Sequence, residues 1–146
     1  MKVIDVFYTD DDEDDLMLFS DAIEKIAEEC DKEIQLHLHT NGDEFIEYIK
    51  NKNSANSIVF LDINMPSKSG YEVLQEIRNE PKTKKTPTIM FSTSKDEGSI
   101  TKCQWLGATH YAIKPSDFKS LISIISRVIA IDWDTYNSDN EIFLIR

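Results

Sequence analysis

The feature that most constrains the fold is a regular alternation of short apolar runs with longer amphipathic stretches. The run SIVFLD (57–62) is apolar up to its final acid, which is typical of a strand buried on both faces. The stretch 15–30 instead spaces its apolar residues about one helical turn apart, at Leu16, Phe19, Ile23 and Ile26. Five strand-like and five helix-like segments alternate in this way. The pattern predicts a parallel sheet with helices on both faces.

The predicted elements occupy most of the 146 residues, a length that fits one domain. Gly107 is expected to end the fourth helix, and Ser116 is expected to cap the start of the fifth. The predicted strands are 3–9, 33–40, 57–62, 87–94 and 109–115. The predicted helices are 15–30, 42–53, 71–79, 96–108 and 116–131.

Composition argues against several classes of function. The net charge is -11, with 27 acidic against 16 basic residues, which disfavours direct binding to nucleic acid or to an anionic membrane. No apolar run approaches the roughly 20 residues that span a bilayer. The first ten residues do not resemble a signal peptide. Cys30 and Cys103 are far apart and outside any Cys-x-x-Cys pair, which suits a reducing cytoplasm and predicts neither a metal ligand nor a redox centre.

Chemically active residues follow four of the predicted strands. Asp10–Asp11 end the first strand, Asp62 the third, Ser92–Thr93 the fourth and Lys114–Pro115 the fifth. Because sites in open α/β sheets gather beyond the carboxyl ends of the strands, these side chains are expected to converge. Three neighbouring carboxylates would raise one another's pKa unless a cation neutralised them. A hard divalent ion such as Mg²⁺, which prefers oxygen ligands, is the simplest candidate.

This set of residues, in this order and at these strand ends, resembles the receiver domain of bacterial two-component response regulators. The resemblance covers about residues 1–130 and leaves 131–146 as a C-terminal extension. It implies a flavodoxin-like, doubly wound sheet of five parallel strands in the order 2-1-3-4-5, flanked by five helices. Because the extension is too short for a DNA-binding or catalytic output domain, we expect a stand-alone, CheY-like receiver.

The resemblance also implies a role for each site residue. Asp62 would accept the phosphoryl group, and Mg²⁺ would be held by Asp10, Asp11, Asp62 and the backbone carbonyl of Asn64. Lys114 and Ser92 would contact phosphoryl oxygens. Asn64 and Ser94 would flank the phosphate.

The implied switch links phosphorylation to a change of protein partner. Ser92, selected over Thr93 by counting from Pro87, would move toward the phosphate, and Tyr111 would rotate inward. Pro115 is the candidate cis-proline. The signal would appear on the fourth helix, fifth strand and fifth helix. The partners implied are a histidine kinase or phosphotransfer protein and a downstream protein target; enzymatic activity would be limited to self-phosphorylation and dephosphorylation.

Several residues have a structural interpretation. Asp12 to Asp15 are expected to be surface acids near the positive end of a helix, so that Asp15→Asn should matter little and Asp11→Asn should abolish Mg²⁺-dependent phosphorylation. His37 and His39 are interpreted as a polar strand face in preference to a metal pair. His110 is expected to be exposed, and Trp105 to pack within its helix layer.

The extension carries Trp133, Tyr136, Phe143, Leu144 and Ile145, and Ile124 and Ile131 widen the apolar stripe of the last helix. Two alternatives are open: a homodimer contact of this helix and the tail, or packing of the tail onto its own chain as an added strand or a cover. Two rival functions also remain. A Mg²⁺-dependent phosphohydrolase would usually carry an acid at position 64, which is Asn. A non-phosphorylated interaction module would be expected to have lost Asp62, Asp11 or Lys114.

Overall fold

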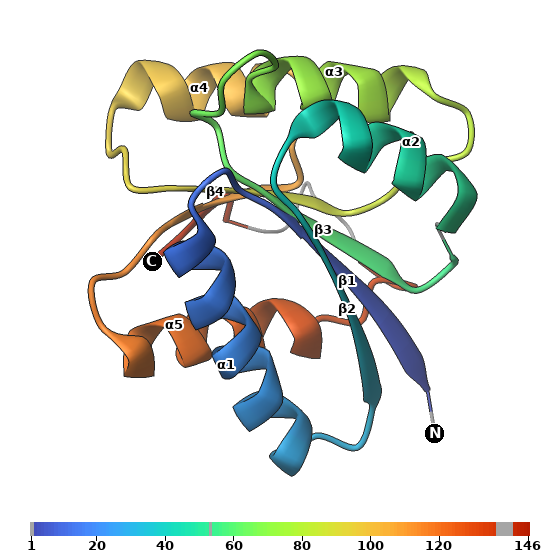
Figure 1. Cartoon of the computed structure of the whole chain (residues 1–146), viewed down its shortest axis with the longest axis vertical. Coiled ribbons are helices and arrows are strands. Elements are labelled where there is room, and N and C mark those ends of the chain that lie inside the picture. The colour runs from blue at the N-terminus through green and yellow to red at the C-terminus, as the bar shows by residue number, and fades with distance from the viewer. Residues whose placement is uncertain (1, 53, 137–141) are drawn as a thin grey trace.

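The computed structural model describes residues 2–52, 54–136 and 142–146. Figure 1 shows a central sheet between two helical layers, with α1 and α5 on one face and α2, α3 and α4 on the other. This arrangement confirms the doubly wound α/β fold that the alternation predicts.

The strands pair in parallel throughout the sheet. Within the described ranges the sheet has six strands in the order β2-β1-β3-β4-β5-β6. The expected order 2-1-3-4-5 is therefore confirmed, and a short sixth strand is added beside β5. The strands are β1 (Val3–Thr9), β2 (Glu33–His39), β3 (Ser57–Leu61), β4 (Thr88–Ser92), β5 (His110–Ile113) and β6 (Leu144–Ile145).

The five predicted helices are present, with small shifts at their ends. They are α1 (Glu13–Glu29), α2 (Gly42–Lys52), α3 (Gly70–Asn79), α4 (Glu97–Trp105) and α5 (Phe118–Ala130). The last residue of the predicted second helix, Asn53, lies outside the described residues. None of the helices in the described part of the chain combines the length and apolar character needed to cross a bilayer.

The sheet separates two apolar cores. Because successive strand residues point to opposite faces, the continuous apolar run of β3 serves both of them. Ile58 and Phe60 pack in the core with α1 and α5, whereas Val59 and Leu61 pack in the core with α2, α3 and α4. β3 is thus buried on both faces and paired with β1 and β4 on its two edges, and Asp62 directly follows it.

Of the two helix ends predicted from the sequence, one is confirmed and the other is wrong. Gly107 adopts a φ of 97° directly after α4, as expected of a glycine that ends a helix. The expected cap of α5 at Ser116 is wrong, because Asp117 occupies that position and its Oδ1 accepts from the Ser120 N–H at 2.8 Å. Serine and aspartate are both good caps, so residue type alone does not select between them. The cap is the residue whose backbone is extended just before the first helical turn, which is Asp117.

The C-terminal tail lies against its own chain and accounts for one wrong expectation about burial. In β6, Leu144 pairs with Tyr111, and the Tyr111 N–H donates to the Phe143 carbonyl at 3.1 Å. His110 is buried rather than exposed, since its imidazole bonds to the Phe143 carbonyl and to the Tyr136 hydroxyl. Residues 137–141 of the tail lie outside the described residues.

Trp105, in contrast, does not pack within its helix layer. Its side chain is 88% exposed at the last residue of α4. Ile124, which sequence periodicity placed on a widened apolar stripe, is buried in the core with α1.

Candidate functional site

Strand register brings two of the predicted site residues side by side. Thr9 of β1 pairs with Leu61 of β3, so the next residues, Asp10 and Asp62, leave neighbouring strands at the same level. The Asp62 N–H donates to the Thr9 carbonyl at 3.0 Å, which extends the pairing into the site. Both carboxyl groups are largely buried.

Three carboxylates meet at this edge of the sheet. Oxygens of Asp10, Asp11 and Asp62 all lie within 4.8 Å of one another, with Asp11 exposed and the other two buried. A hard divalent cation prefers such a set of oxygen donors, so these residues fit a metal of that class. Asn64 is exposed two residues after Asp62, in the loop that leaves β3.

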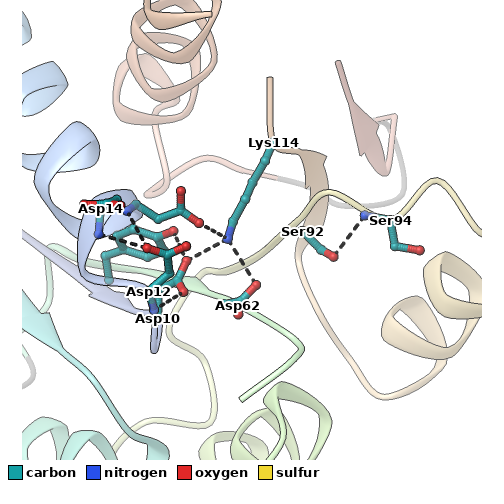
Figure 2. A network of polar contacts seen from close by, with 9 residues as sticks. Asp10, Asp12, Asp14, Asp62, Ser92, Ser94 and Lys114 are labelled. Carbon is teal, nitrogen blue, oxygen red and sulfur yellow. Dashed lines mark hydrogen bonds and ion pairs between the residues drawn. The ribbon is translucent and has the colours of Figure 1, made fainter. Parts of the chain in front are cut away.

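Lys114 reaches the same point from the far side of β4. Its backbone N–H donates to the Ser92 carbonyl at 2.8 Å, and its side chain extends across the strand ends (Figure 2). The ammonium lies 2.6 Å from Asp10 Oδ2, 3.0 Å from Asp15 Oδ2 and 3.2 Å from Asp62 Oδ1. Burial alone would lower the pKa of Lys114, but the hydrogen bond and charge of Asp10 and the charge of Asp62 outweigh it and raise that pKa. Lys114 is therefore a permanent cation here.

Burial raises the pKa of the Asp62 carboxyl to about 6. The positive charge of Lys114 opposes this rise, and the negative charge of Asp10 adds to it. The carboxyl is still mainly ionised at neutral pH, and a cation bound beside it would lower its pKa further. Asp62 therefore has the character of a partly desolvated anion.

A chain of hydrogen bonds links Ser92, at the end of β4, through Ser94 to Tyr111. Ser92 is buried at the end of β4, and its Oγ accepts from the Ser94 N–H at 3.2 Å (Figure 2). The Ser94 carbonyl in turn accepts from the Tyr111 hydroxyl at 2.8 Å. The Tyr111 ring is fully buried, so the aromatic ring that was expected to rotate inward already lies inside. Thr93 is exposed.

The loop after β3 is held against the site by a close backbone approach. The Gly70 N–H donates to the Ile63 carbonyl at 2.7 Å, and a Cβ at Gly70 would lie 2.3 Å from the Asp62 carbonyl oxygen. No side chain fits there without displacing the backbone of Asp62. Within the same loop, Ser67 adopts a φ of 68°, a conformation that costs about 1–2 kcal/mol for a residue with a Cβ.

Two site residues were missed from the sequence. Asp15, grouped with the surface acids that were expected to matter little, is an ion-pair partner of Lys114. Its position in the run of acids does not distinguish it from its acidic neighbours. Tyr8 is buried on the same strand face as Asp10, and its hydroxyl donates to Asp10 Oδ2. Burial, with the charge of Asp10, raises the pKa of Tyr8, so the phenol stays protonated.

The peptide bond before Pro115 differs from the expectation. The expected cis bond before Pro115 is wrong, because the described residues contain no cis peptide bond. Trans is the preferred form even before proline, by about 0.5–1 kcal/mol.

His37 bonds through its two nitrogens to Tyr48 and Asp5, at 2.7 and 2.9 Å. The imidazole of His39 packs against the Tyr48 ring, so the pair forms part of the packing around Tyr48.

Comparison with known proteins identifies a family. The sequence profile described as response regulator receiver domain matches residues 6–126. The chain is 31% identical over 72 residues to response regulator Rcp1 of Synechocystis, which covers 49% of each chain. It is 30% identical over 95 residues to sensor histidine kinase CheAY of Helicobacter pylori, which covers 65% of this chain and 12% of that protein. The matches thus span about half of the first relative and a small part of the second.

Solved structures show the same fold. The phosphorylated cyanobacterial phytochrome response regulator RcpA superimposes with a TM-score of 0.75 at 26% identity, over 86% of this chain and 90% of that chain. A response regulator receiver domain from Rhodospirillum rubrum gives 0.71 at 22% identity, over 86% and 91%. The Mn²⁺-bound form of Rcp1 gives 0.71 at 23% identity, over 94% and 98%.

Proposed function

The chain belongs to the response regulator receiver domain family, and we propose that it serves two-component signalling by accepting a phosphoryl group on Asp62. The observation that carries this proposal is the position of the Asp62 carboxylate. It directly follows the central strand β3, lies within 4.8 Å of the Asp10 and Asp11 carboxylates, and accepts from the Lys114 ammonium at 3.2 Å. Nucleophile, metal ligands and counter-charge are thus gathered at one point.

In the proposed transfer, an Asp62 carboxylate oxygen attacks the phosphorus of the donor. A new O–P bond forms, and the P–N or P–O bond to the donor breaks, with its electron pair leaving on the donor atom. The donor would be a phosphohistidine on a histidine kinase or phosphotransfer protein. Bound Mg²⁺, held by Asp10, Asp11, Asp62 and the Asn64 carbonyl, would supply neutralisation of the phosphoryl charge.

The remaining residues would position the phosphoryl group. Lys114 provides a fixed positive charge next to the accepting carboxylate, and positioning and charge neutralisation carry most of the catalysis in such transfers. Ser92 would donate its hydroxyl to a phosphoryl oxygen. Asn64 and Ser94, which follow Asp62 and Ser92 by two residues each, would flank the phosphate and affect access of water to it.

The chain of contacts from Ser92 to Tyr111 supports a route for the signal. If the Ser92 hydroxyl turns toward the phosphate, the Ser94 N–H loses its acceptor and the backbone at Ser94 would shift. The Ser94 carbonyl, which accepts from the Tyr111 hydroxyl, would shift with that backbone. The consequence would appear on the surface formed by α4, β5 and α5. Receiver domains generally act as signalling modules and not as enzymes on metabolites, so the output would be altered binding of a downstream protein.

The first test is incubation with Mg²⁺ and acetyl phosphate. We expect about one acid-stable, base-labile phosphate per chain, because an aspartyl phosphate is an acyl phosphate. Mass spectrometry should locate it on Asp62 and find none in Asp62→Asn. Asp11→Asn should also abolish labelling by removing a metal ligand, whereas Asp14→Asn, which removes an equal charge from the surface of α1, should not. Phosphate retained by Asp62→Asn rejects the proposal, and sustained turnover of diverse phosphoesters supports a phosphohydrolase instead.

A homodimer formed through α5 and the tail is our proposal for self-association. Phe118 at the start of α5 and Ile142 in the tail both expose apolar side chains. The Arg127 guanidinium on α5 donates to the Arg146 carbonyl at 3.0 Å, so helix and tail form adjacent surfaces.

A further inference from the structure

The Lys114 ammonium has three carboxylate partners, and they are not equivalent. Asp10 and Asp62 belong to the cluster that fits a divalent cation, whereas Asp15 does not. The ammonium and the cation would therefore compete for two of the three carboxylates. Only the Asp15 contact, at 3.0 Å, is free of that competition.

Local structure fixes Asp15 where it can keep this contact. Asp12 caps α1 by accepting from the Asp14 and Asp15 N–H groups at 2.9 and 3.4 Å, which sets the first helical turn beside the site. The Asp15 carboxylate is 36% exposed, while the Lys114 side chain is only 11% exposed. Asp15 is thus the more exposed partner of the buried ammonium, whereas Asp10 is only 1% exposed.

We propose that Asp15 is a positioning residue that holds Lys114 at the site when a divalent cation takes over Asp10 and Asp62. The inference rests on the proposed function and adds a residue to it. Without Asp15, a bound cation would weaken the contacts of the Lys114 ammonium with Asp10 and Asp62. Cation binding would then displace Lys114, or repulsion by the ammonium would lower the affinity for the cation. With Asp15, both positive charges are accommodated, and Lys114 remains beside the accepting carboxylate.

The first experiment measures Mg²⁺ binding alone, by calorimetric titration of the full chain. Asp15→Asn should weaken Mg²⁺ binding by about tenfold, the scale of one charge-assisted hydrogen bond. Asp14→Asn is the matched control, because it removes the same charge from the same turn and no contact of its side chain with Lys114 is found among the described residues. An equal effect of the two variants overturns the proposal.

Repeating the titrations in a Lys114→Met background separates positioning from a general charge effect. If Asp15 acts through Lys114, the difference between Asp15→Asn and Asp14→Asn should disappear when the ammonium is absent. A difference that persists in this background shows that Asp15 acts on the cation directly and overturns the proposal. Asp15→Glu, which keeps the charge, should restore most of the affinity in the chain that retains Lys114.

The second experiment measures phosphorylation by acetyl phosphate at saturating Mg²⁺. Asp15→Asn should lower the maximal rate by about tenfold, because Lys114 is less well placed to stabilise the transferred group. An unchanged maximal rate overturns the positioning role. Failure of the wild-type chain to be labelled would reject the proposed function, while the Mg²⁺ titrations would still decide whether Asp15 holds Lys114.

Discussion

Gly70 shows how one residue outside the reacting groups can shape the site. The loop after β3 passes so close to the strand end that a Cβ at position 70 would lie 2.3 Å from the Asp62 carbonyl oxygen and 2.7 Å from Ile63 Cα. Backbone atoms cannot rotate away as a side chain could. The sequence of this loop therefore depends on a packing constraint as well as on turn preference.

We predict that Gly70→Ala destabilises the protein by about 1–3 kcal/mol, the usual cost of forcing an atom into a filled space. It should also slow phosphorylation, because relief of the clash must move the Asp62 backbone. Urea unfolding and acetyl phosphate labelling measure the two effects. Gly98→Ala in α4 is the control, since its Cβ would meet only the Asp96 side chain, at 3.2 Å. Similar stability of the two variants would contradict this account.

The site residues differ in how far sequence alone could identify them. Asp10, Asp11, Asp62, Ser92 and Lys114 follow strands, and a parallel sheet must bring strand ends together. Asp15 could not be separated from its acidic neighbours, because the contact with Lys114 depends on where α1 begins and how it turns.

At the scale of single elements, helix ends decide details that periodicity leaves open. The start of α5 carries two adjacent cap formers, Ser116 and Asp117, and the structure uses the second. Hydrogen bonds from Ser120 hold the pKa of the Asp117 carboxyl below its ordinary value of 3.8. A carboxyl whose pKa is depressed in the folded state stabilises that state when ionised.

Asp117→Ala should therefore lower the midpoint of thermal unfolding at pH 7 by about 3 °C, while Ser116→Ala should leave it nearly unchanged. The stabilising effect of Asp117 should be complete above pH of about 4 and disappear as the pH falls through its depressed pKa, because the protonated carboxyl is a weaker acceptor. Thermal unfolding at several pH values measures this. A larger effect of Ser116→Ala would show that the cap lies one residue earlier.

β6 is the element that the sequence left open, since an added strand was only one of the alternatives for the tail. Two residues, Leu144 and Ile145, are too few to show an alternation, and they become a strand only because β5 offers an unpaired edge. Covering that edge also buries His110, which was expected to be exposed.

At the scale of the whole molecule, the tail determines which surfaces remain for partners. In the described residues β6 covers the outer edge of β5, next to α5. The chain carries a net charge of -11, which opposes association of two copies unless apolar contacts outweigh it. Phe118 and Ile142 are the exposed apolar side chains in this region.

If α5 and the tail form a homodimer, the sedimentation coefficient should rise with protein concentration and with salt, which screens the negative charge. Ile142→Asp should shift the chain toward monomer, because it places a charge in the apolar contact. Met17→Asp, at an exposed position on α1, is the matched control and should have no such effect. A chain that sediments as a monomer at every concentration, with no response to Ile142→Asp, rules out this dimer.

The sequence by itself determined the alternation of elements and the residues that end each main strand. Both follow from local rules, because burial of an apolar run and the spacing of a helix are written in neighbouring residues. Only the tertiary structure decided which acids of the run from Asp10 to Asp15 meet Lys114, that Pro115 follows a trans bond, and that the tail adds a strand. These outcomes depend on contacts between segments up to about a hundred residues apart, as between Asp15 and Lys114 at a separation of 99. Such contacts are set by packing and register, which no local pattern encodes.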